Sequence, residues 1–395
     1  MDFAFNPEQN AWRQEIRQFL KENPKENFPV QSGDLGYGYG AWSNEFGQLL
    51  GSKGWISMTW PKEYGGSERP LMDLLILMEE LAYSQAPWHS VSQNFTMGNM
   101  VIDIGSDLLK KELLPGIARG EERFWLAMSE PEAGSDLLSL KTRAVEEDNH
   151  FLVNGQKVWS SLAERGRYGL LYARTEFDPA AKRSQTISLF LLDKDLPGIT
   201  VRPMINLAGE AHHNEVFLDD VRIPREYLLG QKNQGLPQML KTLDYDRFWA
   251  RFIKPPFCKS VLEQLVQYAR ETRRDGVNLS EDPLVRHSLA ESAIAIEACR
   301  MISWNAGWKM CNGLPFSHEG TLGKVMADEM GQRLFSKGME IMGPYSQLEE
   351  GSRWTPLKAQ IQRWYLSSLG HTLAGGTSEI IRNTIATIGL GLPRS

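Results

Sequence analysis

The sequence predicts an α+β protein in which a mainly helical part, a part made of antiparallel strands and a second helical part follow one another along the chain. Apolar residues recur at helical spacing in the first and last parts, whereas the middle part has short alternating runs between turn formers. At 395 residues the chain is long enough for two or three domains. We expect these to comprise residues 1–122, 123–232 and 233–395.

The first domain is predicted to be helical. Apolar residues recur at helical spacing over 7–20 and 74–81, and 108–117 is typical of a shorter helix that ends at Gly120. The glycine-aromatic segment Tyr37–Gly40 lacks the strand and helix that a dinucleotide-binding fingerprint requires, so we do not assign it that role.

The middle domain is predicted to be a small antiparallel β-barrel or sandwich that ends near Gly230. Its strands are runs of alternating or β-branched residues, and turn formers such as Asp148–Asn149 and Asn154–Gly155 separate them. The predicted strands are 144–158, 170–174, 186–192, 198–204 and 215–223.

The last domain is predicted to be a four-helix bundle, because each long helical segment has an apolar face. The predicted helices are 236–274, 283–310, 319–341 and 357–369.

Composition excludes several classes of function. A net charge of −6 argues against a nucleic-acid-binding surface. Cys258, Cys299 and Cys311 lie far apart, which predicts a reducing compartment and no disulfide or zinc site. His212 and His213 are expected to point to opposite faces of a strand, so we predict no metal site there. No secretory signal or apolar run of about 20 residues is visible, so we expect a cytoplasmic protein without membrane insertion.

Two stretches of the middle domain have residues suited to holding a flat ring. Phe124–Asp136 ends in a Pro- and Gly-containing turn whose backbone can approach a ligand closely. The stretch NGQKVWSS, Asn154–Ser161, offers a Trp that can stack on a heterocycle and two hydroxyls that can hydrogen-bond its edges. Each stretch alone is also typical of a plain connecting turn or of a Trp in a core.

Together these stretches resemble the flavin-binding middle domain of the acyl-CoA dehydrogenase family. SEPEAGSD, Ser129–Asp136, is similar to the family's TEP-x-x-GSD signature, and Trp159–Ser161 is similar to its Trp-Ile-Thr element. The order helix, β, helix is also that of the family. The resemblance implies FAD as the cofactor, with Ser161 hydrogen-bonded to its reactive edge. The cofactor-binding residues that it implies are Leu126, Met128, Ser129, Gly134, Ser135, Trp159, Ser160, Ser161, Arg273, Glu340, Gly343, Thr377 and Glu379.

Three C-terminal stretches extend the resemblance. His371–Ala386 is similar to the family's C-terminal signature, Tyr268–Gly276 to an Arg-x-x-Phe-Gly stretch, and Glu340–Pro344 to a Gln-x-x-Gly-Gly loop. The second stretch lacks the family's Arg and Phe, so either Arg273 or Arg274 makes that contact or the contact is lost. The third has Glu in place of Gln and keeps the first glycine only.

The position of the catalytic base distinguishes branches of the family. The better-known branches have a glutamate before the C-terminal Gly-Thr, where this chain has Gly375 followed by Gly376 and Thr377. Other branches place the base on an earlier helix, immediately before an arginine, which corresponds here to Asp246 and Arg247. Aspartate is shorter than glutamate by about 1.5 Å. The resemblance implies that Asp246 is the base, that Arg247 orients it, and that the Gly375 N–H donates to the thioester oxygen. The substrate-binding residues that it implies are Ser135, Asp244, Arg247 and Gly376.

The implied reaction is α,β-dehydrogenation of an acyl-CoA, with hydride passing to flavin N5 and electrons leaving through an electron-transfer flavoprotein. A base on the internal helix favours branched, cyclic or steroid-derived acyl groups, and the expected assembly is a homotetramer or an α2β2 heterotetramer. Two alternatives stay open: a partner subunit that lacks the base in such a heterotetramer, and a flavin oxidase or monooxygenase on the same fold.

Overall fold

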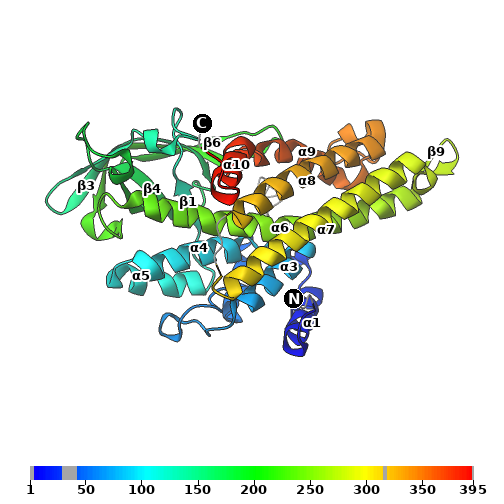
Figure 1. Ribbon diagram of the computed structural model, residues 1–395, viewed down its shortest axis with the longest axis horizontal. Helices are drawn as coiled ribbons and strands as arrows, with labels where there is room; N and C mark the ends of the chain where they lie inside the picture. Colours follow the sequence, from blue (N-terminus) through cyan, green and yellow to red (C-terminus); the bar gives the residue numbers. More distant parts are fainter. Residues whose placement is uncertain (1–3, 29–41, 315–317, 394–395) are drawn as a thin grey trace. The chain divides into compact units, whose positions relative to one another are not determined.

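The computed structural model describes residues 4–28, 42–314 and 318–393 (Figure 1). The segment Tyr37–Gly40 lies outside the described residues. The chain divides into two compact units. We call Trp42–Arg69 with His89–Asp246 the sheet unit, and Met1–Ala41 with Pro70–Trp88 and Arg247–Ser395 the helical unit.

Within its described residues, the sheet unit contains an eight-stranded sheet, drawn in green shades in Figure 1, and the helices α2 (Asn44–Ser52), α4 (His89–Ile104) and α5 (Asp107–Ala118). The strand order is β6-β7-β3-β2-β4-β5-β8, and β1 pairs with β4. The strands are β1 (Phe124–Ala127), β2 (Arg143–Glu146), β3 (His150–Ser161), β4 (Tyr168–Arg174), β5 (Ile187–Asp193), β6 (Ile199–Met204), β7 (His213–Pro224) and β8 (Leu228–Leu229).

Most strand pairs are antiparallel, as predicted. However, β1 pairs with β4 in parallel, and β2 also pairs with β4 in parallel through one residue pair, Arg143 and Arg174. The predicted strand 144–158 is two strands, β2 and β3, joined through the turn at Asp148–Asn149. β1 was not predicted, because four apolar residues are too few to show an alternating pattern.

The sheet has a core on each face of β4 and β5. Leu170 and Leu189 belong to a core shared with α4 and α5, while their neighbours Leu171 and Phe190 belong to a core shared with β3 and β7. Because successive side chains of a strand point to opposite faces, both strands are apolar along their whole length. The core that contains Leu171 and Phe190 joins side chains of β4 and β5 with side chains of β3 and β7. Such packing between separate parts of one sheet is expected of a barrel or sandwich.

The helical unit forms its core between long helices. In Figure 1, α7 runs alongside α8 in the opposite direction. Val261 of α6, Ile296 of α7, Phe335 of α8 and Trp364 of α9 are buried in one apolar cluster. A helix is present at each of the four predicted places, although the first of them is shorter than predicted. The helices of this unit are α1 (Pro7–Glu22), α3 (Leu71–Tyr83), α6 (Gly235–Glu271, which begins in the sheet unit), α7 (Pro283–Cys311), α8 (Glu319–Met342), α9 (Gln360–His371) and α10 (Ser378–Thr384).

The predicted helix 236–274 is too long at its C-terminal end. The helix stops at Glu271, and Arg273–Arg274 (β9) pairs with Val277–Asn278 (β10) in a hairpin. Asp275 and Gly276 both have positive φ, 54° and 83°, which is the backbone that a tight Asp-Gly hairpin turn requires. The correction moves both arginines from a helix to a hairpin.

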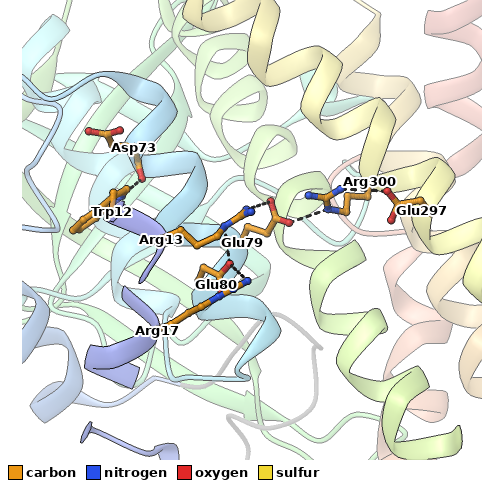
Figure 2. A network of polar contacts seen from close by, with 8 residues as sticks. All are labelled: Trp12, Arg13, Arg17, Asp73, Glu79, Glu80, Glu297 and Arg300. Atoms are coloured by element: carbon orange, nitrogen blue, oxygen red, sulfur yellow. Dashed lines mark hydrogen bonds and ion pairs between the residues drawn. The ribbon is translucent and has the colours of Figure 1, made fainter. Parts of the chain in front are cut away.

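A network of charged side chains joins α1, α3 and α7 within the helical unit (Figure 2). Glu80 of α3 forms an ion pair with Arg13 Nε at 2.9 Å and accepts from Arg17 Nε at 2.8 Å, and its side chain is almost fully buried. Glu79 accepts from Arg300 Nε of α7 at 2.8 Å. These contacts join α1 to α3, and α3 to α7.

Among the described residues, none of the helices combines the length and the apolar character needed to cross a bilayer.

Candidate active site

The two stretches that carry the flavin resemblance lie side by side in the sheet unit. After β1 the chain makes a tight turn, in which Glu130 N donates to Ala133 O at 3.0 Å and Ala133 N donates to Glu130 O at 3.1 Å. Val158 N of β3 donates to Ser129 O at 2.9 Å. Main-chain bonding therefore holds the turn against the strand that carries Trp159.

A buried ion pair reinforces this junction. Lys157 Nζ lies 2.8 Å from Glu130 Oε1 and donates to Met128 O at 3.1 Å. The Glu130 carboxylate also accepts from the backbone N–H groups of Lys141 and Thr142. Full burial lowers the pKa of Lys157 to about 8. Burial acts to raise the pKa of Glu130, but Lys157 and the donors outweigh it, so this pKa lies below its ordinary value.

This pair was not predicted from the sequence. A visible signal existed, because Lys157 lies within a strand pattern at a position where alternation places the side chain on the buried face.

Trp159 lies at a β-bulge. The register between β3 and β7 shifts between Lys157 and Ser160, and Trp159 has φ of +62°. A bulky residue in the left-handed region is an outlier that occurs mainly where a strand turns a side chain towards a site. The indole is 59 % exposed, whereas Lys157 and Ser160 on either side are fully buried. The bulge therefore presents an aromatic face at the surface of the unit.

Ser161 and His213 form a cross-strand pair next to this bulge. Ser161 Oγ lies 3.1 Å from His213 Nδ1, and the His213 ring packs edge-to-face on Trp159 with centroids 5.7 Å apart. Ser160 differs from Ser161, because its side chain is buried and its carbonyl accepts from Asn214 Nδ2 at 3.0 Å.

The adjacent histidines do not point to opposite faces as predicted. β7 begins at His213, and His212 precedes the strand, so strand alternation does not govern its direction. Both side chains are buried, with ring centroids 5.1 Å apart. Burial lowers the pKa of His213 to about 4 and that of His212 well below its ordinary value. Within the described part of the chain, no group of three metal-ligating side chains is found.

The other predicted residues of this region differ in exposure. Leu126 and Ser129 are half-buried and Met128 is buried, while Gly134 and Ser135 are exposed in the turn. The chain from Leu126 to Ser135 therefore passes from partly buried positions to the surface.

Asp244, Asp246 and Arg247 belong to α6. Their side chains, with the others of residues 243–251, lie outside the described residues.

The glycine loop between α9 and α10 lies in the helical unit. Gly375 and Gly376 both have positive φ, 64° and 100°, where side chains with a Cβ are strained. Lys324 of α8 donates to Gly376 O at 2.7 Å and to His371 O at 3.2 Å, and thereby bridges the loop. Thr377 caps α10, since its side chain accepts from Ile380 N, and Glu379 is exposed in the first turn of that helix.

A buried polar cluster lies next to this loop and includes Lys324. Asp328 accepts from Lys254 Nζ at 2.6 Å and pairs with Lys324 Nζ at 3.0 Å. Lys254 Nζ also lies 2.8 Å from His371 Nδ1. All four side chains are at most 3 % exposed. None of the four was predicted from the sequence, because residues far apart in the chain form the cluster.

The two arginines that the sequence left open have different partners. Arg274 donates to Ile341 O at 2.8 Å, in the last turn of α8, which contains Glu340. Arg273 is exposed and donates to Asn278 Oδ1 within its own hairpin. Gly343 ends α8 with φ of +62°.

The chain is similar to known proteins over nearly its full length. Models of the acyl-CoA dehydrogenase N-terminal, middle and C-terminal domains match residues 6–121, 126–221 and 233–390. The chain is 31 % identical over 406 residues to acyl-CoA dehydrogenase FadE29 of Mycobacterium tuberculosis, covering 100 % of this chain and 99 % of that protein. The chain belongs to the acyl-CoA dehydrogenase family. Its fold and its classification as a dehydrogenase, expected from the sequence, are thereby confirmed.

Two solved structures are similar to this acyl-CoA dehydrogenase over its full length. The Tcur3481–Tcur3483 steroid ACAD has a TM-score of 0.88 and 29 % identity, covering 100 % of both chains. The ChsE4–ChsE5 complex from Mycobacterium tuberculosis has a TM-score of 0.85 and 28 % identity, again covering 100 % of both chains.

Enzymes of this family are FAD-dependent flavoproteins, and the predicted cofactor is therefore confirmed as FAD. The sheet unit fits this cofactor. The exposed indole of Trp159 offers a stacking face, and the Ser161 hydroxyl lies on the strand beside it. The Lys157–Glu130 pair and the bond from Val158 N to Ser129 O hold the turn after β1 against the same strand.

Proposed function

We propose that this dehydrogenase oxidises a branched, cyclic or steroid-derived acyl-CoA to its 2-enoyl-CoA. The observation that carries the proposal is the glycine at position 375, which leaves the internal helix as the place for the base. The similarity to a structure described as a steroid ACAD supports the same substrate class.

In this proposal Asp246 takes the substrate α-proton on a carboxylate oxygen, and Arg247 orients that carboxylate. The thioester carbonyl has to be polarised, because the α-hydrogen is otherwise too weak an acid for a carboxylate. The Gly375 N–H supplies a backbone donor for the carbonyl oxygen, a role that needs no side chain. We assign Ser135, Asp244 and Gly376 to substrate binding. FAD, when bound, supplies the acceptor for the hydride that leaves Cβ.

The proposed cofactor contacts involve several segments of the chain. Trp159 and Ser161 present a ring face and a hydroxyl, and the segment Leu126–Ser135 presents backbone groups. Ser160 would contribute through its backbone, since its side chain is buried. We assign the remaining cofactor contacts to Arg273, with Arg274 as the alternative, Glu340, Gly343, Thr377 and Glu379.

We further propose that electrons leave through an electron-transfer flavoprotein and that the protein works in the cytoplasm as a homotetramer or an α2β2 heterotetramer. The heteromeric form is supported by the two similar structures, each of which is described by a pair of chain names.

A second candidate function follows from the possible heterotetramer. The chain would then be the subunit that lacks a base and completes a site with a different partner. Gly375 favours this alternative, because glycine cannot accept a proton.

One experiment separates these functions. The purified chain is assayed for bound FAD and mixed anaerobically with straight-chain, branched, cyclic and steroid-derived acyl-CoA thioesters, while flavin absorbance is followed. We expect bleaching, fastest with a branched, cyclic or steroid-derived substrate. A protein that lacks FAD, or that binds FAD without bleaching by any substrate, supports the partner-subunit function. Peroxide formation in air without an added acceptor supports an oxidase.

A further inference from the structure

His213 contacts two of the residues proposed to hold the flavin. It pairs across the sheet with Ser161, with 3.1 Å between Nδ1 and Oγ, and its ring packs edge-to-face on Trp159. The side chain is only 8 % exposed. No role for it follows from the sequence motifs.

The chemistry of this pair constrains the Ser161 hydroxyl. A neutral imidazole has one N–H and one lone pair, and a serine hydroxyl has a single hydrogen to donate. If Nδ1 carries the hydrogen, it donates to Ser161 Oγ, and the serine hydrogen is directed to another acceptor. If Nδ1 is bare, it accepts that hydrogen, and Ser161 then offers only lone pairs to its surroundings.

Burial favours the neutral ring. It lowers the pKa of His213 to about 4, so the imidazole is uncharged near pH 7. Its neighbour His212 is also buried, with ring centroids 5.1 Å apart, so a second positive charge is disfavoured there. The ring therefore acts on Ser161 through hydrogen-bond direction and not through charge.

We propose that His213 is a positioning residue for bound FAD, which orients the Ser161 hydroxyl and thereby sets the reduction potential of the flavin. This inference rests on the proposed function, in which Ser161 hydrogen-bonds the reactive edge of the ring. A hydrogen bond that favours one redox form over the other changes the ratio of the two forms at a given potential.

The test uses four variants: His213→Leu, which removes both ring nitrogens, His213→Asn, which retains a polar atom near the place of Nδ1, Ser161→Ala, and the double variant Ser161→Ala/His213→Leu. For each purified holoprotein, FAD content, the flavin absorption spectrum and the midpoint potential are measured. His150→Leu is the matched control, because His150 lies at the opposite end of the same strand pair and bonds Asn149.

We expect His213→Leu to retain FAD and to change the ratio of oxidised to reduced flavin at least tenfold, which is about 30 mV for a two-electron couple. Ser161→Ala should shift the potential to a similar extent, and the double variant should shift it no further, because His213 acts through Ser161. His213→Asn should lie closer to the wild type than His213→Leu, and His150→Leu should match the wild type.

Two results overturn the proposal: an unchanged potential in His213→Leu, or additive shifts in the double variant. If His213→Leu does not fold, His213→Asn and Ser161→Ala provide the test instead. A wild-type flavin spectrum and midpoint potential in both of these variants overturns the proposal. A wild-type chain that binds no FAD contradicts the proposed function itself and is distinguished by its lack of colour.

Discussion

Lys157 Nζ and Glu130 Oε1 lie 2.8 Å apart inside the sheet unit, and each belongs to a different one of the two stretches that resemble flavin-binding motifs. The pair fixes the turn after β1 to the strand that carries Trp159. Two residues that are 27 positions apart in the chain thus join the two motifs, because a buried charge in one requires a partner in the other.

Replacing Lys157 should therefore affect both stability and cofactor binding. Lys157→Met leaves the Glu130 carboxylate buried without its counter-ion, which should lower the free energy of unfolding by about 3–5 kcal/mol. FAD affinity should fall with it, because the turn loses its anchor. Urea unfolding and FAD titration of the apoprotein measure these effects. Lys141→Met, which removes an exposed lysine paired with Glu132, is the control and should change stability by less than about 1 kcal/mol. Equal effects of the two substitutions would contradict this role.

Stability should decline in mild acid because of the buried histidines. His212 and His213 are neutral in the folded protein, whereas the unfolded chain binds protons at both below about pH 6.5. The free energy of unfolding therefore falls as the pH drops from 6.5 towards 4. His213 alone should account for a loss of about 2 kcal/mol at pH 5.

Urea unfolding at several pH values between 7.5 and 5 checks this dependence. In His213→Leu the free energy of unfolding should fall less steeply with decreasing pH than in the wild type. The difference in slope should correspond to the uptake of up to one proton fewer on unfolding. His287→Leu, which changes an exposed histidine of α7, should retain the wild-type slope. A wild-type slope in His213→Leu would show that this histidine does not contribute.

Lys324 should hold the glycine loop in place. Lys324→Met removes the donor to the carbonyls of His371 and Gly376, at a cost of about 3 kcal/mol if both stay unsatisfied. Amide hydrogen exchange should rise in residues 372–377 while the α7–α8 core stays protected. Lys337→Met removes another lysine of α8, one that pairs with Glu291, and should leave exchange in the loop unchanged. Unaltered loop exchange in Lys324→Met would rule out the bridging role.

The charged network of Figure 2 should stabilise the attachment of α1. Glu80→Gln removes the carboxylate that Arg13 and Arg17 share, which should lower the free energy of unfolding by about 2–4 kcal/mol. Limited proteolysis should then cut within α1 sooner than in the wild type. The control is Glu8→Gln, at an exposed position in the first turn of the same helix. Proteolysis at the wild-type rate in Glu80→Gln would contradict this role.

Local patterns predicted much of the fold. The long helices from α6 to α9 and the strands β4 to β7 were predicted within a few residues, because their apolar periodicity is strong. α4 was missed, since its buried face includes polar residues such as Asn94 and Thr96 that weaken the periodic pattern. The hairpin at Asp275–Gly276 had a visible turn signal that a long helical pattern concealed.

The site was less predictable than the fold. The family resemblance assigned Trp159 and the turn after β1 to the flavin site, but the bulge at Trp159 depends on the pairing of β3 with β7, which the local sequence does not show. The pair of Ser161 with His213 and the bridge from Lys324 to the glycine loop join segments about 50 residues apart. Such contacts follow from tertiary structure and leave no periodic signal in the chain.

The role of Asp246 as the base is tested most directly by anaerobic bleaching of the flavin in the isolated, FAD-loaded chain, with the best substrate of the acyl-CoA series. The wild type should bleach rapidly. Asp246→Asn should retain FAD but bleach at least about 100-fold more slowly, because the α-proton no longer has an acceptor. Bleaching of Asp246→Asn at the wild-type rate would contradict the assignment.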